Sequence, residues 1–118
     1  MYSVSAWVNK NSPVLYIRCR IENLSDHEKY MYWWSNIAVP ETKGTRIIVP
    51  AAEALVSFYS TDHYLIDKTA VPLSGGVDAS YPCNIATSRD FFYKIPKDSH
   101  KWIAAVNEQG KGLLQFSK

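Results

Sequence analysis

The chain has 118 residues, of which 47% are hydrophobic and 20% are charged, so it is long and apolar enough to form a domain with its own core. Its formal net charge is only +2 and Lys and Arg are not clustered, which gives no support for binding to nucleic acid. No apolar run approaches the ~20 residues of a membrane helix. The N-terminus also lacks the basic start and apolar core of a signal peptide, so we expect a cytoplasmic protein that does not bind a membrane.

An N-terminal hairpin is the first predicted element. Tyr2–Val8 alternates between larger apolar residues and small or polar ones, and the turn-forming run Asn9–Pro13 follows it. Residues 14–22 alternate more cleanly, with apolar side chains on one face and mostly charged ones on the other. A polar connection, residues 23–29, leads to the next run.

The run Tyr30–Pro50 (YMYWWSNIAVPETKGTRIIVP) is predicted to be the central element, with two strands joined by a turn at residues 40–45. Successive strand residues point to opposite faces. Trp33 is therefore expected to be buried and Trp34 at least partly accessible. The predicted core face holds Met31, Trp33, Ser35, Ile37 and Val39, and the predicted wet face holds Tyr30, Tyr32, Trp34, Asn36 and Ala38.

The rest of the chain predicts further strands. Helix formers and strand formers are mixed in Ala51–Tyr59, which is expected to be irregular or a single helical turn, and Ser60–Asn84 is expected to be rich in loops. Strands are predicted at Asp90–Ile95, Trp102–Val106 and Leu113–Phe116, the last two forming a hairpin. We expect one all-β domain over residues 1–118, built as an antiparallel β-sandwich.

The predicted wet face is the strongest functional signal in the sequence. Sugars present flat C–H faces and a rim of hydroxyl groups, so their sites combine aromatic rings with amides and carboxylates. Tyr32, Trp34 and Asn36 supply this combination, with Glu41 at the end of the strand and His63 in the loop-rich segment as further candidate ligand-binding residues. The competing interpretation is that Trp34 packs beneath a loop or a second sheet.

Catalysis has weaker support. Asp62, His63 and Asp78 could supply an acid and a base, but glycoside chemistry needs two carboxyl groups at a set separation. The sequence contains no nucleophile-elbow motif and no phosphate-binding loop. Cys19 and Cys83 lack metal-ligand spacing and are expected to be buried free thiols. We therefore assign no catalytic residue, metal or cofactor from sequence.

Several runs of the chain resemble a known family. These are YMYWWSNIAVPETKGTRIIVPA, DASYPCN, SRDFFYKI, KWIAAV and GKGLLQFS, within residues 15–117. They are similar to a bacterial domain of unknown function that is often joined to tetratricopeptide repeats and is related in fold to galactose mutarotase. The resemblance implies an all-β super-sandwich with a concave sheet that faces carbohydrate. Such domains are about twice as long, so the chain would correspond to about the first half. The catalytic His and Glu of mutarotases cannot be placed on individual residues of this sequence, so the resemblance leaves enzymatic activity open.

The leading hypothesis is a carbohydrate-binding β-sandwich domain that is not catalytic as it stands. One alternative is a structural or protein-interaction module, and another is half of a mutarotase-like or glycoside-hydrolase-like enzyme. Tyr2–Val8 and Leu113–Phe116 are the expected sheet edges, since each lacks a sequence neighbour on one side. Open edges and exposed apolar faces are usually covered, so we expect a homodimer.

Overall fold

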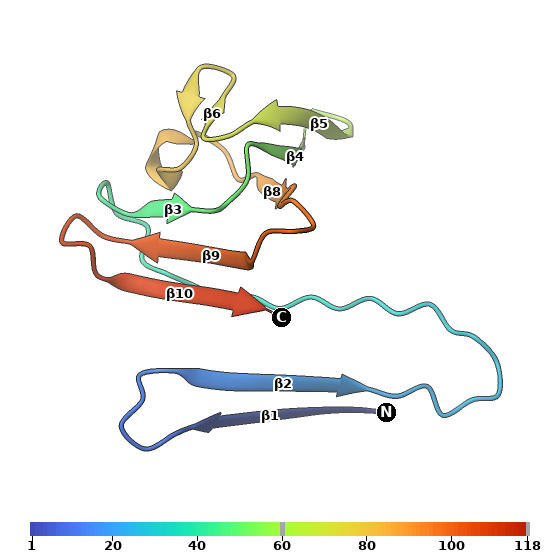
Figure 1. Ribbon diagram of the computed structural model, residues 1–118. Helices are drawn as coiled ribbons and strands as arrows, with labels where there is room; N and C mark the ends of the chain where they lie inside the picture. Colours follow the sequence, from blue (N-terminus) through green and yellow to red (C-terminus); the bar gives the residue numbers. More distant parts are fainter. Residues whose placement is uncertain (60, 118) are drawn as a thin grey trace. The chain divides into compact units, whose positions relative to one another are not determined.

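The computed structural model describes residues 1–59 and 61–117, and it is almost entirely β, with 44% of residues in strands and no α-helix in the described part (Figure 1). Every strand pair is antiparallel. The prediction of an all-β fold with antiparallel sheets is therefore confirmed. The chain divides into two compact units, Met1–Asn36 and Ile37–Lys118, and the single-domain organisation stays a prediction.

The first unit is built on a two-stranded hairpin. Strand β1 (Tyr2–Val8) pairs along its whole length with β2 (Leu15–Ile21), with Tyr2 opposite Ile21 and Val8 opposite Leu15. Asn11 has a φ of 63° in the connection, a left-handed conformation that asparagine tolerates better than most residues. The predicted N-terminal hairpin is confirmed.

The hairpin register gives its two faces different chemistry. On the polar face, Trp7 and Tyr16 stack with ring centroids 5.4 Å apart, and the Arg18 guanidinium lies 6.0 Å from the centre of the Trp7 ring. The other face is apolar along both strands, and most of its side chains are exposed. It comprises Tyr2, Val4, Ala6, Val8, Leu15, Ile17, Cys19 and Ile21.

The predicted strand over Tyr30–Val39 is wrong, because residues 22–45 contain no strand. The backbone of residues 30–36 runs extended in Figure 1, but no described strand pairs with it, and a strand exists only through its ladder of hydrogen bonds. The predicted burial of Trp33 is also wrong, since the side chain is 48% exposed. Without a sheet behind it, neither side of this segment has a core to face.

Strand β4 (Glu53–Tyr59) is the centre of the first sheet of the second unit, between β5 (Tyr64–Ala70) and β8 (Asp90–Tyr93). Ala54 and Val56 on this strand are 0% and 4% exposed. The expectation of an irregular or helical segment at Ala51–Tyr59 is therefore wrong. Pairing on both sides and burial outweigh the helix preference of Ala, Glu and Leu at this place.

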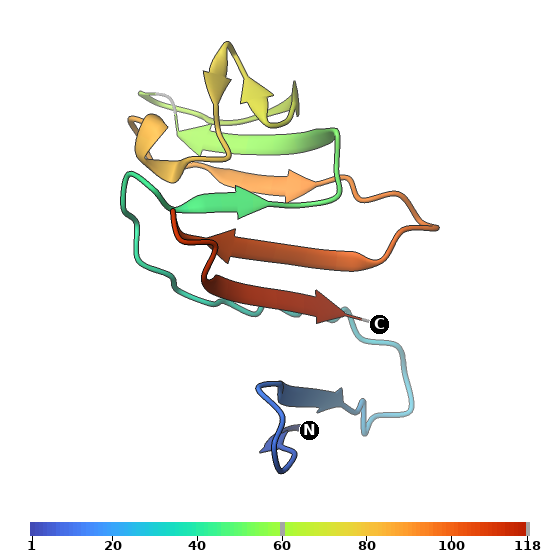
Figure 2. The same cartoon turned by 60° about the vertical axis from the view of Figure 1, so that its left-hand side comes forward.

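A second sheet has β9 (Lys101–Val106) between β3 (Arg46–Ile48) and β10 (Gly112–Ser117), as Figure 2 shows. The extended run after the turn at residues 40–45 and the C-terminal hairpin are thus confirmed. Strands β1 and β10 both lie at sheet edges, as expected.

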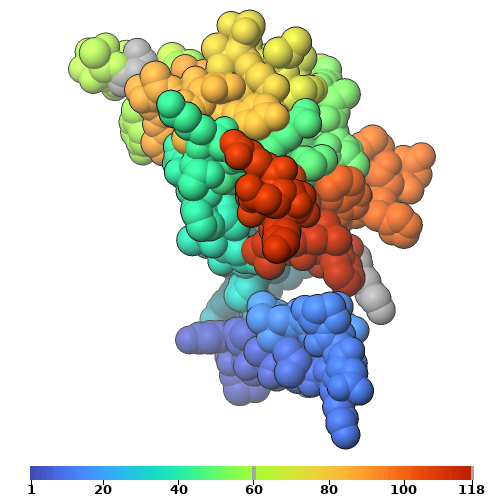
Figure 3. Space-filling model, turned by 90° about the vertical axis from the view of Figure 1, so that its left-hand side faces the viewer, coloured from blue at the N-terminus to red at the C-terminus, as the bar shows by residue number. Residues whose placement is uncertain are grey.

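The turn between β9 and β10 is held by Asn107, whose side-chain oxygen accepts hydrogen bonds from the backbone N–H groups of Gln109 (3.0 Å) and Lys111 (2.9 Å). Figure 3 shows this turn, in orange-red, against the segment that precedes β3. The approach is close, because a side chain at Gly44 would overlap that of Glu108. The chain just before β3 therefore passes close to the turn between β9 and β10.

A small hairpin, β6 (Leu73–Ser74) and β7 (Val77–Asp78), is followed by the 3-10 helix η1 (Pro82–Asn84). The loop-rich interpretation of Ser60–Asn84 is therefore wrong for β5 and for this hairpin, whereas turns, bends and η1 make up most of its other described residues. Gly75 and Gly76 form the turn with φ values of 57° and 82°. A backbone hydrogen bond of 2.7 Å from Ile47 to Ser80 ties the segment after β7 to β3.

The burial of β4 predicts a specific stability difference. Val56→Ala should lower the free energy of unfolding by roughly 1.5–3 kcal/mol, because it removes buried apolar surface and leaves a cavity. Val77→Ala is the matched control, since Val77 is 42% exposed and should change stability by less than about 0.5 kcal/mol. Urea denaturation measures both. Equal losses would show that β4 is not the core strand of this unit.

Candidate functional site

Tyr32, Trp34 and Asn36 lie together on the extended segment of the first unit, and we call them the aromatic–amide cluster. The Tyr32 and Trp34 ring centroids are 5.9 Å apart with an interplanar angle of 37°. The Trp34 indole N–H donates a hydrogen bond of 2.7 Å to the side-chain oxygen of Asn36. Alternate residues of an extended chain share a side, so the predicted grouping arises without a sheet.

The cluster is accessible to a ligand, since Tyr32 is 79% exposed and Trp34 is 49% exposed. The hydrogen bond to the indole fixes the Asn36 amide, and its NH₂ group keeps two donors. The cluster therefore offers two neighbouring ring faces with hydrogen-bond donors at their edge. This combination suits a ligand that has both an apolar face and acceptor oxygens.

The other two predicted ligand-binding residues belong to the second compact unit. Glu41 is exposed and precedes the turn before β3, and His63 is exposed in the connection between β4 and β5. The structure thus brings together three of the five predicted residues. The spacing of residues 32, 34 and 36 within one extended segment can be read from the sequence. Whether Glu41 and His63 lie near them depends on the tertiary structure, which the spacing does not give.

Asp62, His63 and Asp78, the possible acid and base residues, are not connected with one another in the structure. Asp78 forms no hydrogen bond or ion pair with Asp62 or His63, all of which are described residues. Asp62 and His63 are exposed between β4 and β5, and Asp78 ends β7. The predicted burial of the two cysteines is wrong, since Cys83 is exposed and Cys19 is only partly buried, but both thiols are free as expected.

Asp78 instead organises a hydrogen-bond network that we did not predict from the sequence. Its carboxylate accepts hydrogen bonds from the Ser80 hydroxyl (2.6 Å) and the Ser80 backbone N–H (3.0 Å). These two bonds, in that order, and the charge of Arg46 hold the pKa of Asp78 below its usual value, although burial opposes them. Arg46 in turn donates from Nε to the Ser80 oxygen at 3.2 Å, and its guanidinium lies 5.4 Å from the centre of the Tyr81 ring.

Only part of this network had a sequence signal. An aspartate two residues before a serine is a common local hydrogen-bonding pattern, so the bond between Asp78 and Ser80 could have been predicted. Arg46 is 34 positions away from Ser80 in sequence, and the fold brings them together beside the backbone hydrogen bond from Ile47 of β3 to Ser80.

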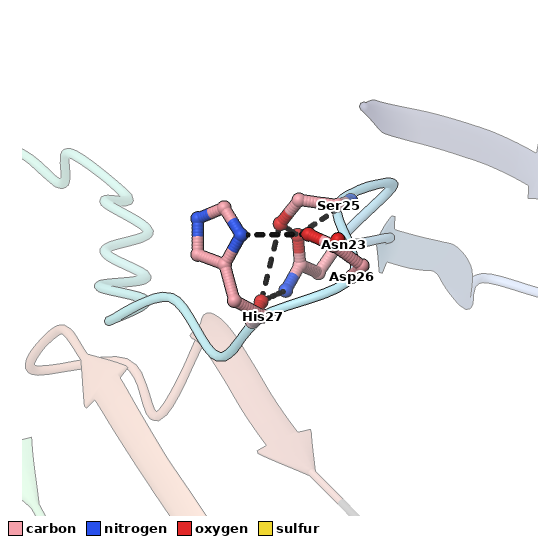
Figure 4. A network of polar contacts seen from close by, with 4 residues as sticks. All are labelled: Asn23, Ser25, Asp26 and His27. Atoms are coloured by element: carbon pink, nitrogen blue, oxygen red, sulfur yellow. Dashed lines mark hydrogen bonds and ion pairs between the residues drawn. The ribbon is translucent and has the colours of Figure 1, made fainter.

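A second polar network shapes the loop after β2 (Figure 4). The Asn23 amide donates to the backbone oxygen of His27 at 2.7 Å, and its oxygen accepts from the Ser25 hydroxyl at 2.6 Å. The Asp26 carboxylate lies 2.9 Å from Nδ1 of His27, and this hydrogen bond lowers the pKa of Asp26. The contacts all fall within five consecutive residues, so we interpret the network as a loop brace and not as a reaction centre.

The described residues contain no group of three or more His, Cys, Asp or Glu side chains placed to hold a metal ion. No helix in this part of the chain has the length and apolar character needed to span a lipid bilayer. No family model, curated protein or solved structure matches the chain.

The Asp78 network predicts a pH dependence of stability. A lowered pKa in the folded state means that ionised Asp78 stabilises the fold fully above about pH 3.9, and that this contribution is lost as the pH falls through the lower folded value. Asp78→Asn keeps an acceptor oxygen but cannot ionise, so its free energy of unfolding should fall less steeply in acid. Urea denaturation over a series of acidic pH values measures the slopes.

Ser80→Ala should flatten the acid dependence in the same way, because it removes the hydroxyl that contributes most to the lowered pKa. Ser88→Ala is the matched control at an exposed serine and should keep the wild-type slope. A slope for Asp78→Asn identical to that of the wild type would contradict this assignment.

Proposed function

We propose that the chain is a carbohydrate-binding β-domain that is not catalytic by itself. The observation that carries the proposal is the aromatic–amide cluster, in which two exposed and neighbouring rings stand beside an amide held by the Trp34 indole. An aromatic ring can stack on the C–H face of a sugar, and the Asn36 NH₂ group can donate to a ring or hydroxyl oxygen.

Affinity should be weak. The cluster lies on an exposed segment and not in a deep pocket, so it can cover only part of a sugar ring, and most of the ligand stays in water. Millimolar dissociation constants are therefore expected for monosaccharides. Tighter binding is expected for longer saccharides that contact both rings at once.

Adjacent tryptophans provide a matched pair of variants to test the proposal. Trp33 and Trp34 are 48% and 49% exposed, so replacing either removes a similar amount of accessible surface. Trp34→Ala should weaken sugar binding by about 2–10 fold, the range expected for one aromatic contact. Trp33→Ala should bind as the wild type does, because its ring is not part of the cluster.

Binding is measured by titrating tryptophan fluorescence with a panel of mono- and oligosaccharides, with circular dichroism as the check on folding. Equal weakening by both variants would place the ligand elsewhere. No response to any sugar at millimolar concentrations would remove the carbohydrate proposal.

We also propose that the antiparallel sheets belong to a β-sandwich of the galactose-mutarotase kind. The support is the all-β composition together with the sequence resemblance described above. Under this proposal the sheets form two packed layers and one layer faces carbohydrate.

A protein-interaction module is the second candidate, and the apolar face of the β1–β2 hairpin favours it. On this face Val4, Val8, Leu15 and Ile17 are each more than half exposed. Two-stranded hairpins are at best marginally stable alone, so such a face gains by packing on another apolar surface. A second copy of the chain offers an identical face and permits a two-fold dimer.

Assembly gives a separate prediction. Sedimentation velocity at micromolar concentrations should show a homodimer, and Ile17→Lys on the apolar face should shift it to monomer. Arg20→Lys, on the opposite face of the same strand, should leave the dimer intact. A wild-type chain that sediments as a monomer would exclude assembly through this face.

A further inference from the structure

The second unit contains a cavity of about 160 Å³ that the proposed carbohydrate site does not use. Its wall is mostly apolar and is formed by β3, by Val49 and Ala51 just after it, and by Val71, Pro72, Ala79, Ser80 and Tyr93. An engineered apolar cavity of about 150 Å³ is known to admit benzene, so this space can hold one six-membered ring or a branched group of similar size.

Arg46 is the one charged residue among those that line this cavity. Its Nε donates to the Ser80 oxygen at 3.2 Å, and its guanidinium lies 5.4 Å from the centre of the Tyr81 ring. These two contacts hold the guanidinium of the exposed Arg46 beside Ser80 and Tyr81. No described residue accepts a hydrogen bond from its terminal Nη groups, so these donors are open to a ligand.

The residue that accepts the hydrogen bond from Arg46 is Ser80, which is 7% exposed. Its hydroxyl donates a hydrogen bond of 2.6 Å to the Asp78 carboxylate, so the hydroxyl oxygen of Ser80 accepts the hydrogen bond from Arg46 Nε. The Asp78 carboxylate is bound by two donors of Ser80 and does not form an ion pair with Arg46 among the described contacts. The positive charge at the cavity is therefore not cancelled by direct pairing.

Tyr93 supplies a polar group on the β8 side of the cavity. Burial raises the pKa of Tyr93, so its phenol stays protonated and neutral at physiological pH. The wall thus adds no negative charge of its own at this place. Figure 2 shows β3, in green, near the short orange helix η1. Ser80 and Tyr81 directly precede this helix in sequence.

We propose that this cavity binds a small monocarboxylate whose apolar part is about the size of a benzene ring. The ring or branched group fills the apolar space, and the carboxylate receives paired hydrogen bonds from the planar Nη groups of Arg46. Arginine suits this role because its guanidinium matches the geometry of a carboxylate. The cavity lies wholly within the second unit, so the proposal is independent of the carbohydrate site in the first.

Benzoate is the probe that tests the proposal, with benzyl alcohol as the neutral ligand of the same ring size and 2-naphthoate as a carboxylate that is too large. Two-dimensional NMR titration of the folded chain measures the dissociation constants. Benzoate should bind, and should shift backbone signals of β3 and residues 79–81. Benzyl alcohol should bind about tenfold more weakly, since it lacks charge-assisted hydrogen bonds, and 2-naphthoate should not bind.

Arg46→Gln should weaken benzoate binding about tenfold. Arg89→Gln is the matched control, because Arg89 also lies 5.4 Å from the centre of an aromatic ring, that of Phe58, in the same unit, and it should bind benzoate as the wild type does. If Arg46→Gln fails to fold, Arg46→Lys keeps the charge without the paired geometry and should bind several-fold more weakly than the wild type. Equal binding of benzoate and benzyl alcohol, equal effects of Arg46→Gln and Arg89→Gln, or no benzoate binding would each overturn the proposal.

Discussion

The second unit depends on the burial of strand β4. This strand has partners on both sides, and it carries Ala54, Val56 and Ser57, each less than 5% exposed. Most other strand residues in the described chain are exposed or only partly buried. A small core of this kind stabilises one sheet well, and it leaves the remaining apolar side chains at surfaces where ligands or other proteins can reach them.

Elements that depend on the local residue pattern were predicted correctly from the sequence. Both hairpins predicted at the ends of the chain are present, because alternation and turn residues specify register over a few positions. The secondary-structure prediction was wrong where pairing with other strands determines the structure. Ala51–Tyr59 became a strand because β5 and β8 flank it, and Tyr30–Val39 did not, although its residues favour strands, because nothing described pairs with it.

The candidate sites follow the same division. Tyr32, Trp34 and Asn36 were predicted to share a side from their spacing, and they contact one another even though the supporting strand is absent. The Arg46 site was not predicted, because its members come from β3 and from the segment after β7. A surface formed by neighbours in sequence can be read from spacing, whereas a cavity formed by distant segments requires the fold.

We propose above all that the aromatic–amide cluster is a ligand-binding surface. The most direct measurement follows the four tryptophan indole N–H signals by NMR while an oligosaccharide is added. We expect the Trp34 signal to shift until the site is saturated, because its N–H lies at the cluster and is hydrogen-bonded to Asn36. The Trp33 signal should shift much less. A titration in which Trp34 does not move, or moves no more than the other three, would contradict it.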